Sequence, residues 1–245
     1  MINLFLLVFM IDFHTHILPD IDDGACDADE SLQMLKLCKK QGVDIVFATP
    51  HFYPNEDDPD NFIESRTRAF RQLTEAMDKD GSEFPVVYPA AEVLYFPGMS
   101  MADGLASLKM GELPCILIEP PMIPWGESML DEIEETGNNL NMIPIIAHID
   151  RYMRLLNDYS LTDMVSGRRM LVQVNASFFI REQSRKIAME MLNNDEFHLI
   201  GSDCHNLTDR APNIGTAAQI IRKNGGASKF AEIVKKSYRM IGSIK

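Results

Sequence analysis

Seven short apolar runs recur along this chain, and each of them closes on a polar side chain. Most of the closing side chains are able to bind a metal ion. In chain order they are His14 and His16, His51, Glu92, Glu119, His148, Asn175, and Asp203 with His205. Short runs rich in β-branched residues are typical of buried β-strands. The series therefore predicts seven strands that carry functional groups at their C-terminal ends.

Helical patterns alternate with these runs. Apolar residues recur with helical spacing over 30–42, 61–81 and 127–139, and Gly42 and Gly81 mark the ends of the first two segments. Alternating strands and helices predict a parallel sheet that is covered on both faces. Seven such units indicate an α/β fold with a closed β/α barrel, in which functional residues gather at the C-terminal ends of the strands.

The domain organisation is expected to be simple. A chain of 245 residues can form one large domain, and no repeat, linker or low-complexity tract divides it, so we expect residues 10–245 to form a single domain. Residues 1–9 are apolar but lack the basic start of a signal peptide, and they are too short to span a bilayer. They are interpreted as an extension or a misassigned start, with Met10 as the other possible start.

Charge and cysteine content narrow the function classes. The 36 acidic residues outnumber the 23 basic ones and give a formal net charge of −13. This balance works against nonspecific binding to nucleic acid or to anionic membranes, where Lys and Arg supply the affinity. The four cysteines show no C-x-x-C spacing and no disulfide framework, which fits a reducing compartment. We expect a cytoplasmic protein without membrane insertion or nucleic-acid partners.

The stretch HTHILPDIDDG contains the strongest metal-binding signal. Residues i and i+2 of a strand point to the same side, so His14 and His16 can direct both imidazoles at one point. Together with other strand-end residues they form an N/O-donor set that suits Mn, Fe, Co, Zn or Mg. The proposed ligands are His14, His16, Asp23, His51, Glu92, Glu119, His148, Asp203 and His205. Nine ligands exceed the need of one ion, and Glu92 is able to bridge two.

Two further signals come from single residues. Arg151 follows His148 by three positions and Arg210 follows His205 by five, and a guanidinium fork matches phosphate oxygens in a bidentate way. We therefore interpret Arg151 and Arg210 as substrate contacts of a multinuclear metallophosphoesterase or related hydrolase. His198 opens the last apolar run instead of closing it, which predicts a surface or structural histidine at the opposite end of the barrel.

The segments HTHILPDIDDG, ATPHF, AEVLY, IEP, AHIDRY, QVNAS and SDCHNLTDR, in this order, resemble the PHP (polymerase and histidinol phosphatase) superfamily. More closely, they are similar to the CpsB/CapC-type bacterial manganese-dependent protein-tyrosine phosphatases of capsule and exopolysaccharide operons. The resemblance covers the chain from Met10 to the C-terminal helices. It implies a distorted seven-stranded TIM-like barrel of the PHP type with three divalent ions. Manganese is the expected metal, and Fe, Co, Zn or Mg are the alternatives.

The resemblance also implies how the residues are used. His14, His16, Glu92 and Asp203 match the ligands of a first ion, Glu119 and His148 join Glu92 at a second, and Asp23, His51 and His205 match those of a third. Arg151 and Arg210 match phosphate-binding arginines. The implied reaction is direct attack of activated water on phosphotyrosine, without a covalent phosphoenzyme. The implied substrate is the tail of a bacterial tyrosine kinase that regulates polysaccharide synthesis.

Other interpretations stay open at this point. Cys204 and Arg210 satisfy the C-x5-R pattern of cysteine-dependent tyrosine phosphatases, but the intervening HNLTD has no glycine and Asp203 places a negative charge beside the thiol. A PHP-type phosphatase of a small phosphomonoester such as histidinol phosphate is the alternative enzyme. The Pro-rich loop at 120–124 differs from the pattern of the family that the chain resembles. The resemblance therefore does not predict how the rim formed by this loop selects substrates.

Overall fold

The computed structural model of the protein describes residues 10–156 and 161–242. The expected nine-residue extension, 1–9, therefore lies outside the described residues. The strands are β1 (Met10–Thr15), β2 (Val43–Ala48), β3 (His51–Phe52), β4 (Val86–Pro89), β5 (Glu92–Leu94), β6 (Cys115–Glu119), β7 (Ile143–Ile146), β8 (Leu171–Asn175) and β9 (Leu199–Gly201). The α-helices are α1 (Ala28–Lys40), α2 (Pro59–Asp80), α3 (Glu127–Leu140), α4 (Ile149–Leu156), α5 (Leu161–Val165), α6 (Ala176–Ile180), α7 (Glu182–Asn193), α8 (Ile214–Lys223) and α9 (Ala227–Gly242). Two 3-10 helices, Met99–Met101 and Leu105–Leu108, lie between β5 and β6.

The predicted α/β fold of the TIM-like barrel type is confirmed, and its parallel sheet is curled into a half-barrel. All strand pairs are parallel, and they run in the orders β1-β2-β4 and β3-β5-β6-β7-β8-β9. The pairs β2/β3 and β4/β5 are each separated by two residues, so the described strands make seven segments. The sheet curls until the chain after β9 meets the end of β1, where the Asp203 amide donates to the His14 carbonyl at 2.8 Å.

The helices form where the sequence predicted them. The α1 segment begins after Asp27, whose side chain accepts a hydrogen bond from the Glu30 amide, and it ends before Gly42 at φ 86°. Likewise, α2 ends at Gly81, which has a φ of 70° that glycine adopts at little cost. In α3, residues Glu127–Leu140 match the predicted segment closely.

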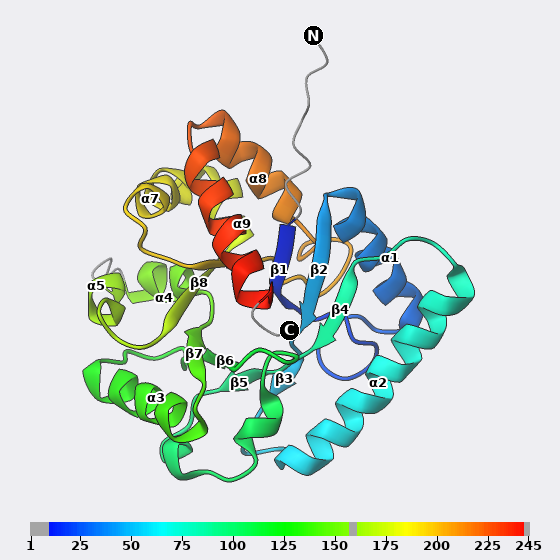
Figure 1. Ribbon diagram of the computed structural model, residues 1–245, viewed down its shortest axis with the longest axis horizontal. Coiled ribbons are helices and arrows are strands. Elements are labelled where there is room, and N and C mark those ends of the chain that lie inside the picture. Colours follow the sequence, from blue (N-terminus) through cyan, green and yellow to red (C-terminus); the bar gives the residue numbers. More distant parts are fainter. Residues whose placement is uncertain (1–9, 157–160, 243–245) are drawn as a thin grey trace.

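Apolar side chains cover both faces of the sheet. The larger core lies between the strands and α1, α2, α3, α7 and α8, which surround the sheet in Figure 1. A second core contains Phe13, Phe47, Leu117 and Ile145 from neighbouring strands, and α9 lies beside β1 and packs against this core through Tyr238. Burial on both faces explains why the strands are almost continuously apolar.

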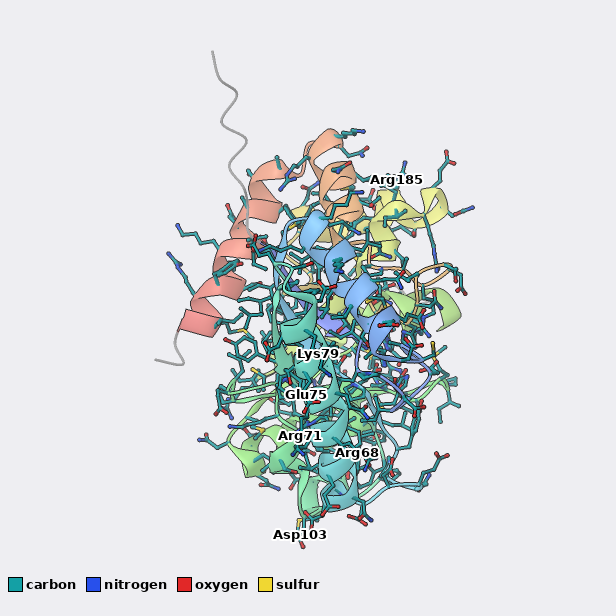
Figure 2. All side chains as sticks on the ribbon, turned by 90° about the vertical axis from the view of Figure 1, so that its right-hand side faces the viewer. Arg68, Arg71, Glu75, Lys79, Asp103 and Arg185 are labelled. Atoms are coloured by element: carbon teal, nitrogen blue, oxygen red, sulfur yellow. The ribbon has the colours of Figure 1, made fainter. Side chains whose placement is uncertain are left out.

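The surface of the longest helix is polar. Figure 2 shows Arg68, Arg71, Glu75 and Lys79 along α2, all of them exposed, while Leu73 of the same helix is buried in the core. This is the amphipathic pattern of a helix that covers a sheet. Over residues 10–156 and 161–242, no helix has both the length and the apolar character needed to cross a membrane.

Candidate metal centre

All nine predicted ligand residues converge at the C-terminal ends of the strands. Glu92 lies at the centre of the group, with 1% of its surface exposed. Its Oε2 atom lies 3.1 Å from His14 Nε2, 3.3 Å from His16 Nε2 and 3.1 Å from His51 Nδ1. Its Oε1 atom faces the other way, 2.9 Å from His148 Nε2. The two oxygens of one buried carboxylate thus face different sets of imidazoles.

The remaining carboxylates complete three overlapping groups of donor atoms. Asp203 Oδ1 lies 3.7 Å from His14 Nε2 and 3.6 Å from His16 Nε2. Glu119 Oε1 lies 3.4 Å from His148 Nε2. Three sets of ligand atoms, each within 4.8 Å of one another, are His14–His16–Glu92, His51–Glu92–Glu119 and His16–Asp23–His51–His205.

Asp23 stands at the mouth of the site. Its side chain is 62% exposed, and Oδ1 lies 3.5 Å from His51 Nε2 and 3.2 Å from His205 Nε2. His51 therefore faces Asp23 with one ring nitrogen and Glu92 with the other. The division into three separate ligand sets that the resemblance implies is only partly visible, because His51 and His16 each belong to two groups.

The donor set fits divalent cations. Buried ring nitrogens of His51, His148 and His205 have no hydrogen-bond partner among the described residues, although two of these atoms lie within about 3.2 Å of a carboxylate. Burial would raise the pKa of Glu92, but His14 and the hydrogen bonds from neighbouring histidines lower it well below its usual value. Converging imidazole nitrogens around an anionic carboxylate match the ligand chemistry of Mn, Fe, Co or Zn.

Irregular backbone positions two of the ligands. His148 follows β7 with a φ of 29°, and Asp203 follows β9 with a φ of 54°, a left-handed region that is uncommon outside glycine. The prediction that the last strand continues to Asp203 and His205 is wrong, because β9 ends at Gly201. A Cβ atom at position 201 would lie 2.5 Å from His14 Cβ, so only glycine allows this close approach of the two strands.

The sequence did not predict which residues orient the ligands, although Asn175 was among the polar residues expected at strand ends. Asp22 accepts a hydrogen bond from His16 Nδ1 at 2.7 Å and one from the His51 amide at 3.1 Å. Gln173 lies 3.3 Å from His14 Nδ1 through its Oε1 atom, and Asn175 donates to Asp203 Oδ2 at 3.0 Å. Asp22 belongs to the DIDDG segment, so its carboxylate was visible in the sequence, but its direction depends on the loop.

The loop that carries Asp22 depends on one glycine. A Cβ atom at Gly24 would lie 2.1 Å from the carbonyl oxygen of His16, which real structures do not allow. The Ala25 amide donates to the same carbonyl at 3.0 Å. Gly24 therefore lets the loop fold back against His16 and place Asp22 behind its ring. This explains why a glycine ends the aspartate-rich stretch.

Both predicted arginines face the cluster. Arg151 donates to Glu119 Oε1 at 3.0 Å and to Asp203 Oδ2 at 2.7 Å, and Arg210 donates to Asp203 Oδ1 at 2.8 Å. Both line a cavity of about 1060 Å³, together with Asp23, His51 and Glu119. Two guanidinium groups beside a carboxylate and imidazole cluster are an arrangement that suits a phosphate group.

Cys204 does not form a nucleophile loop. The residue is fully buried, and burial raises the pKa of its thiol well above the ordinary value. The amides of His205 and Asn206 both donate to the carbonyl of Arg210, at 2.9 and 3.4 Å, and are therefore not directed at a ligand. A cysteine-dependent phosphatase needs a low-pKa thiol and free loop amides, so this arrangement argues against that interpretation.

His198 has the structural place that the sequence predicted. It is exposed, precedes β9, and accepts a hydrogen bond from the Val172 amide at 3.0 Å through Nδ1. Since it lies before the strand, it is at the end of the sheet opposite to the metal centre.

Comparisons with known proteins identify the family to which the chain belongs. The model of a family described as "Capsular polysaccharide synthesis, CpsB/CapC" matches residues 10–241. The tyrosine-protein phosphatase CpsB of Streptococcus pneumoniae is 30% identical over 95% of this chain and 98% of its own length. The tyrosine-protein phosphatase YwqE of Bacillus subtilis is 27% identical over 89% of this chain and 86% of its own length.

A solved structure shows the same fold. It belongs to a study of YwqE from Bacillus subtilis and CpsB from Streptococcus pneumoniae, described as unique metal-dependent tyrosine phosphatases. It superposes with a TM-score of 0.78 at 24% identity and covers 90% of this chain and 89% of that chain. A lactonase from Listeria monocytogenes, with a TM-score of 0.52 over 94% of this chain and 92% of that chain, shares the fold more distantly. The chain belongs to the CpsB/CapC family.

Proposed function

We propose that this protein is a metal-dependent tyrosine-protein phosphatase that uses three divalent ions, with manganese as the expected metal. The observation that carries the proposal is the convergence of nine ligand residues and two arginines at one site, where Asp23, His51, Glu119 and Asp203 line a cavity together with both arginines. The membership of the CpsB/CapC family supports the same activity, since its named relatives are tyrosine-protein phosphatases. We further propose that residues 10–245 form a single phosphatase domain and that the protein is cytoplasmic.

The proposed ligand sets are those that the resemblance implies, and the contacts around Glu92 agree with them except that His51 Nδ1 also lies 3.1 Å from the Oε2 atom of Glu92. Its Oε2 atom faces His14 and His16, and Asp203 lies on the same side, so these four residues are proposed to hold one ion. Glu92 would also help to hold a second ion, together with Glu119 and with His148, which faces its Oε1 atom. The cluster of Asp23, His51 and His205 is proposed to hold the third. When bound, such ions supply an activated water molecule and neutralise charge on the phosphoryl oxygens.

The protein side chains bind and orient the phosphate. Arg151 and Arg210 are held beside the cluster by Glu119 and Asp203, so their remaining N–H groups are proposed to donate to phosphoryl oxygens. The pairing fixes each guanidinium in advance, which lowers the entropy lost when substrate binds. Charge that develops on the phosphoryl group during hydrolysis strengthens these contacts. Contacts that are stronger in the transition state than in the bound substrate increase the reaction rate.

The cavity favours a phosphotyrosyl side chain on a protein. Its volume of about 1060 Å³ is larger than a small phosphomonoester requires. Tyr53 and Met122 line it as well, and Tyr53 stacks on His51 with ring centroids 5.0 Å apart. These side chains are proposed to contact the aromatic ring of the substrate. The proposed physiological substrate is the phosphorylated tail of a tyrosine kinase in capsular or exopolysaccharide synthesis.

A direct comparison of substrates tests the proposal. The manganese-loaded protein should hydrolyse a phosphotyrosine peptide with a kcat/KM well above that for histidinol phosphate or for the matching phosphoserine peptide. Release of inorganic phosphate measures all three reactions. A higher kcat/KM for histidinol phosphate would replace the proposed substrate class, and absence of turnover with every phosphoester would refute the proposed activity.

Asp22→Asn is expected to weaken metal binding without removing a proposed ligand. Burial opposes ionisation of Asp22, but the hydrogen bond from His16 holds its pKa near 2, so an anionic carboxylate orients the ring. Loss of such an orienting carboxylate typically costs about tenfold to a hundredfold in metal affinity. Manganese titration followed by calorimetry measures the effect. Asp20→Asn removes the same charge from an exposed position in the same loop and should leave affinity unchanged; equal affinity in both variants would contradict the orienting role.

A further inference from the structure

The cavity extends beyond the metal centre, along the end of α6 and the first turns of α7. Its wall there is formed by Ser177, Phe178, Arg181, Gln183, Ser184 and Ile187. The lining also contains Asp209, Arg210 and Asn213, which precede α8. None of the nine proposed ligands lies on the α6–α7 wall. A substrate larger than a single phosphotyrosine side chain would therefore contact this part of the cavity.

Arg181 is chemically unlike the other two arginines of the cavity. Arg151 and Arg210 are paired with the carboxylates of the cluster, at 2.7–3.0 Å for their hydrogen bonds. Arg181 is exposed, and its guanidinium makes no hydrogen bond or ion pair with any residue in the described parts of the chain. Arg181 is thus a cation in the cavity wall, and all N–H donors of its guanidinium are available to a ligand. A guanidinium in that state is suited to a carboxylate or phosphate of the substrate.

The backbone at Arg181 is firmly held. Its amide donates to the Ser177 carbonyl at 3.0 Å, and its own carbonyl accepts from the Arg185 amide at 3.0 Å. The Arg185 side chain, labelled on α7 in Figure 2, donates to the carbonyls of Phe179 and Ile180 at 3.1 and 2.8 Å. These contacts fix the junction between α6 and α7. Arg181 therefore projects from a rigid corner, which favours a specific contact over a nonspecific one.

We infer that Arg181 is a specificity-determining residue, which selects phosphotyrosine peptides that carry a second anionic group near the phosphotyrosine. The inference rests on the proposed function. The anionic group is a carboxylate or a second phosphate, because both accept two parallel N–H bonds from one guanidinium. Arg181 acts on substrate binding and not on the reacting atoms, so its contribution falls mainly on KM.

Matched peptides test this role. A phosphotyrosine peptide with one glutamate, moved stepwise along the flanks, is compared with the same peptide carrying glutamine, and a doubly phosphorylated peptide forms the third arm. For the native protein, the kcat/KM of the best glutamate peptide should exceed that of its glutamine partner by about threefold to tenfold. Arg181→Ala should remove this preference by raising KM, and p-nitrophenyl phosphate should be hydrolysed at the native rate. A larger effect in the doubly phosphorylated arm than in the glutamate arm would assign the subsite to phosphate.

Charge reversal at Arg181 and a control on the adjoining helix α7 make the test specific. Arg181→Glu should reverse the preference toward a lysine peptide, an outcome that misfolding cannot produce. Lys186→Ala removes an exposed charge from α7 outside the cavity wall and should keep the native preference. A preference for glutamate that persists in Arg181→Ala, or an equal loss with all substrates, would overturn the inference. If no phosphotyrosine substrate is turned over, the proposed function fails, and the ratio of glutamate to glutamine peptide affinities, measured by fluorescence anisotropy, still decides the role of Arg181.

Discussion

Glu92→Ala is expected to abolish phosphatase activity and to remove more bound metal than any other single ligand substitution. Glu92 is almost fully buried, and its two oxygens lie 2.9–3.3 Å from nitrogens of His14, His16, His51 and His148. A carboxylate that serves two ions affects both of them when it is lost. We expect a loss on the order of a hundredfold or more in kcat/KM, because even residues that only orient ligands contribute about tenfold to a hundredfold.

The comparison with Asp23 makes this prediction specific. Asp23 is mostly exposed, and the histidine nitrogens nearest to it belong to His51 and His205, at 3.5 and 3.2 Å, so Asp23→Ala should lower the content of one ion and leave the others. Elemental analysis and kcat/KM are measured on the same samples. Asp209→Ala removes another carboxylate of the cavity that belongs to none of the three ligand groups, and it should retain the full metal content. Full occupancy and rate in Glu92→Ala, with loss in Asp23→Ala, would show that the central role of Glu92 is wrong.

Arg210→Ala and Cys204→Ser are expected to have opposite outcomes. Arg210 lines the cavity beside Asp203, and removing a charge-assisted contact to phosphate costs about 1.5–3 kcal/mol, hence about tenfold or more in kcat/KM. Cys204 is buried among core residues, and its thiol does not face the cavity lining. Cys204→Ser should therefore keep kcat/KM within about threefold of the native value, with at most a modest loss of stability from burying a hydroxyl.

Folding and metal content must be checked for both variants. Circular dichroism and elemental analysis show whether a loss of rate comes from lost chemistry. Arg210→Lys is the matched variant, because it keeps the charge and loses the bidentate geometry, so its rate should lie between those of the native protein and Arg210→Ala. A folded, metal-loaded Cys204→Ser protein without activity would support a cysteine nucleophile and contradict the metal mechanism.

The position of the metal centre was predictable because strand direction is predictable. In a parallel sheet all C-terminal strand ends meet at one edge, so residues as distant in sequence as His14 and Asp203 are brought together once the strands are recognised. The i and i+2 spacing of His14 and His16 indicated a shared target, and their Nε2 atoms lie 3.2 Å apart.

The details of the centre could not be predicted because they depend on backbone that departs from regular strands. The chain leaves β7 and β9 with positive φ at His148 and Asp203, and no sequence pattern predicts that geometry for residues other than glycine. The role of Asp22 depends on the loop after β1, which only a glycine at position 24 allows, and the role of Gln173 depends on how β8 lies relative to His14. The ligand group of His51 could not be predicted either. One of its ring nitrogens faces Asp23 and the other faces Glu92, and this orientation is visible only in the structure.

The central claim is that a cluster of divalent ions held by the strand-end residues carries out the hydrolysis. The most direct test is to remove all metal with a chelator, to confirm by circular dichroism that the fold is intact, and to add manganese back in steps. Bound metal and hydrolysis of a phosphotyrosine peptide are measured on each sample. We expect the metal-free protein to be inactive and activity to return as bound metal rises toward three ions per chain. Full activity in folded, metal-free protein would contradict the account.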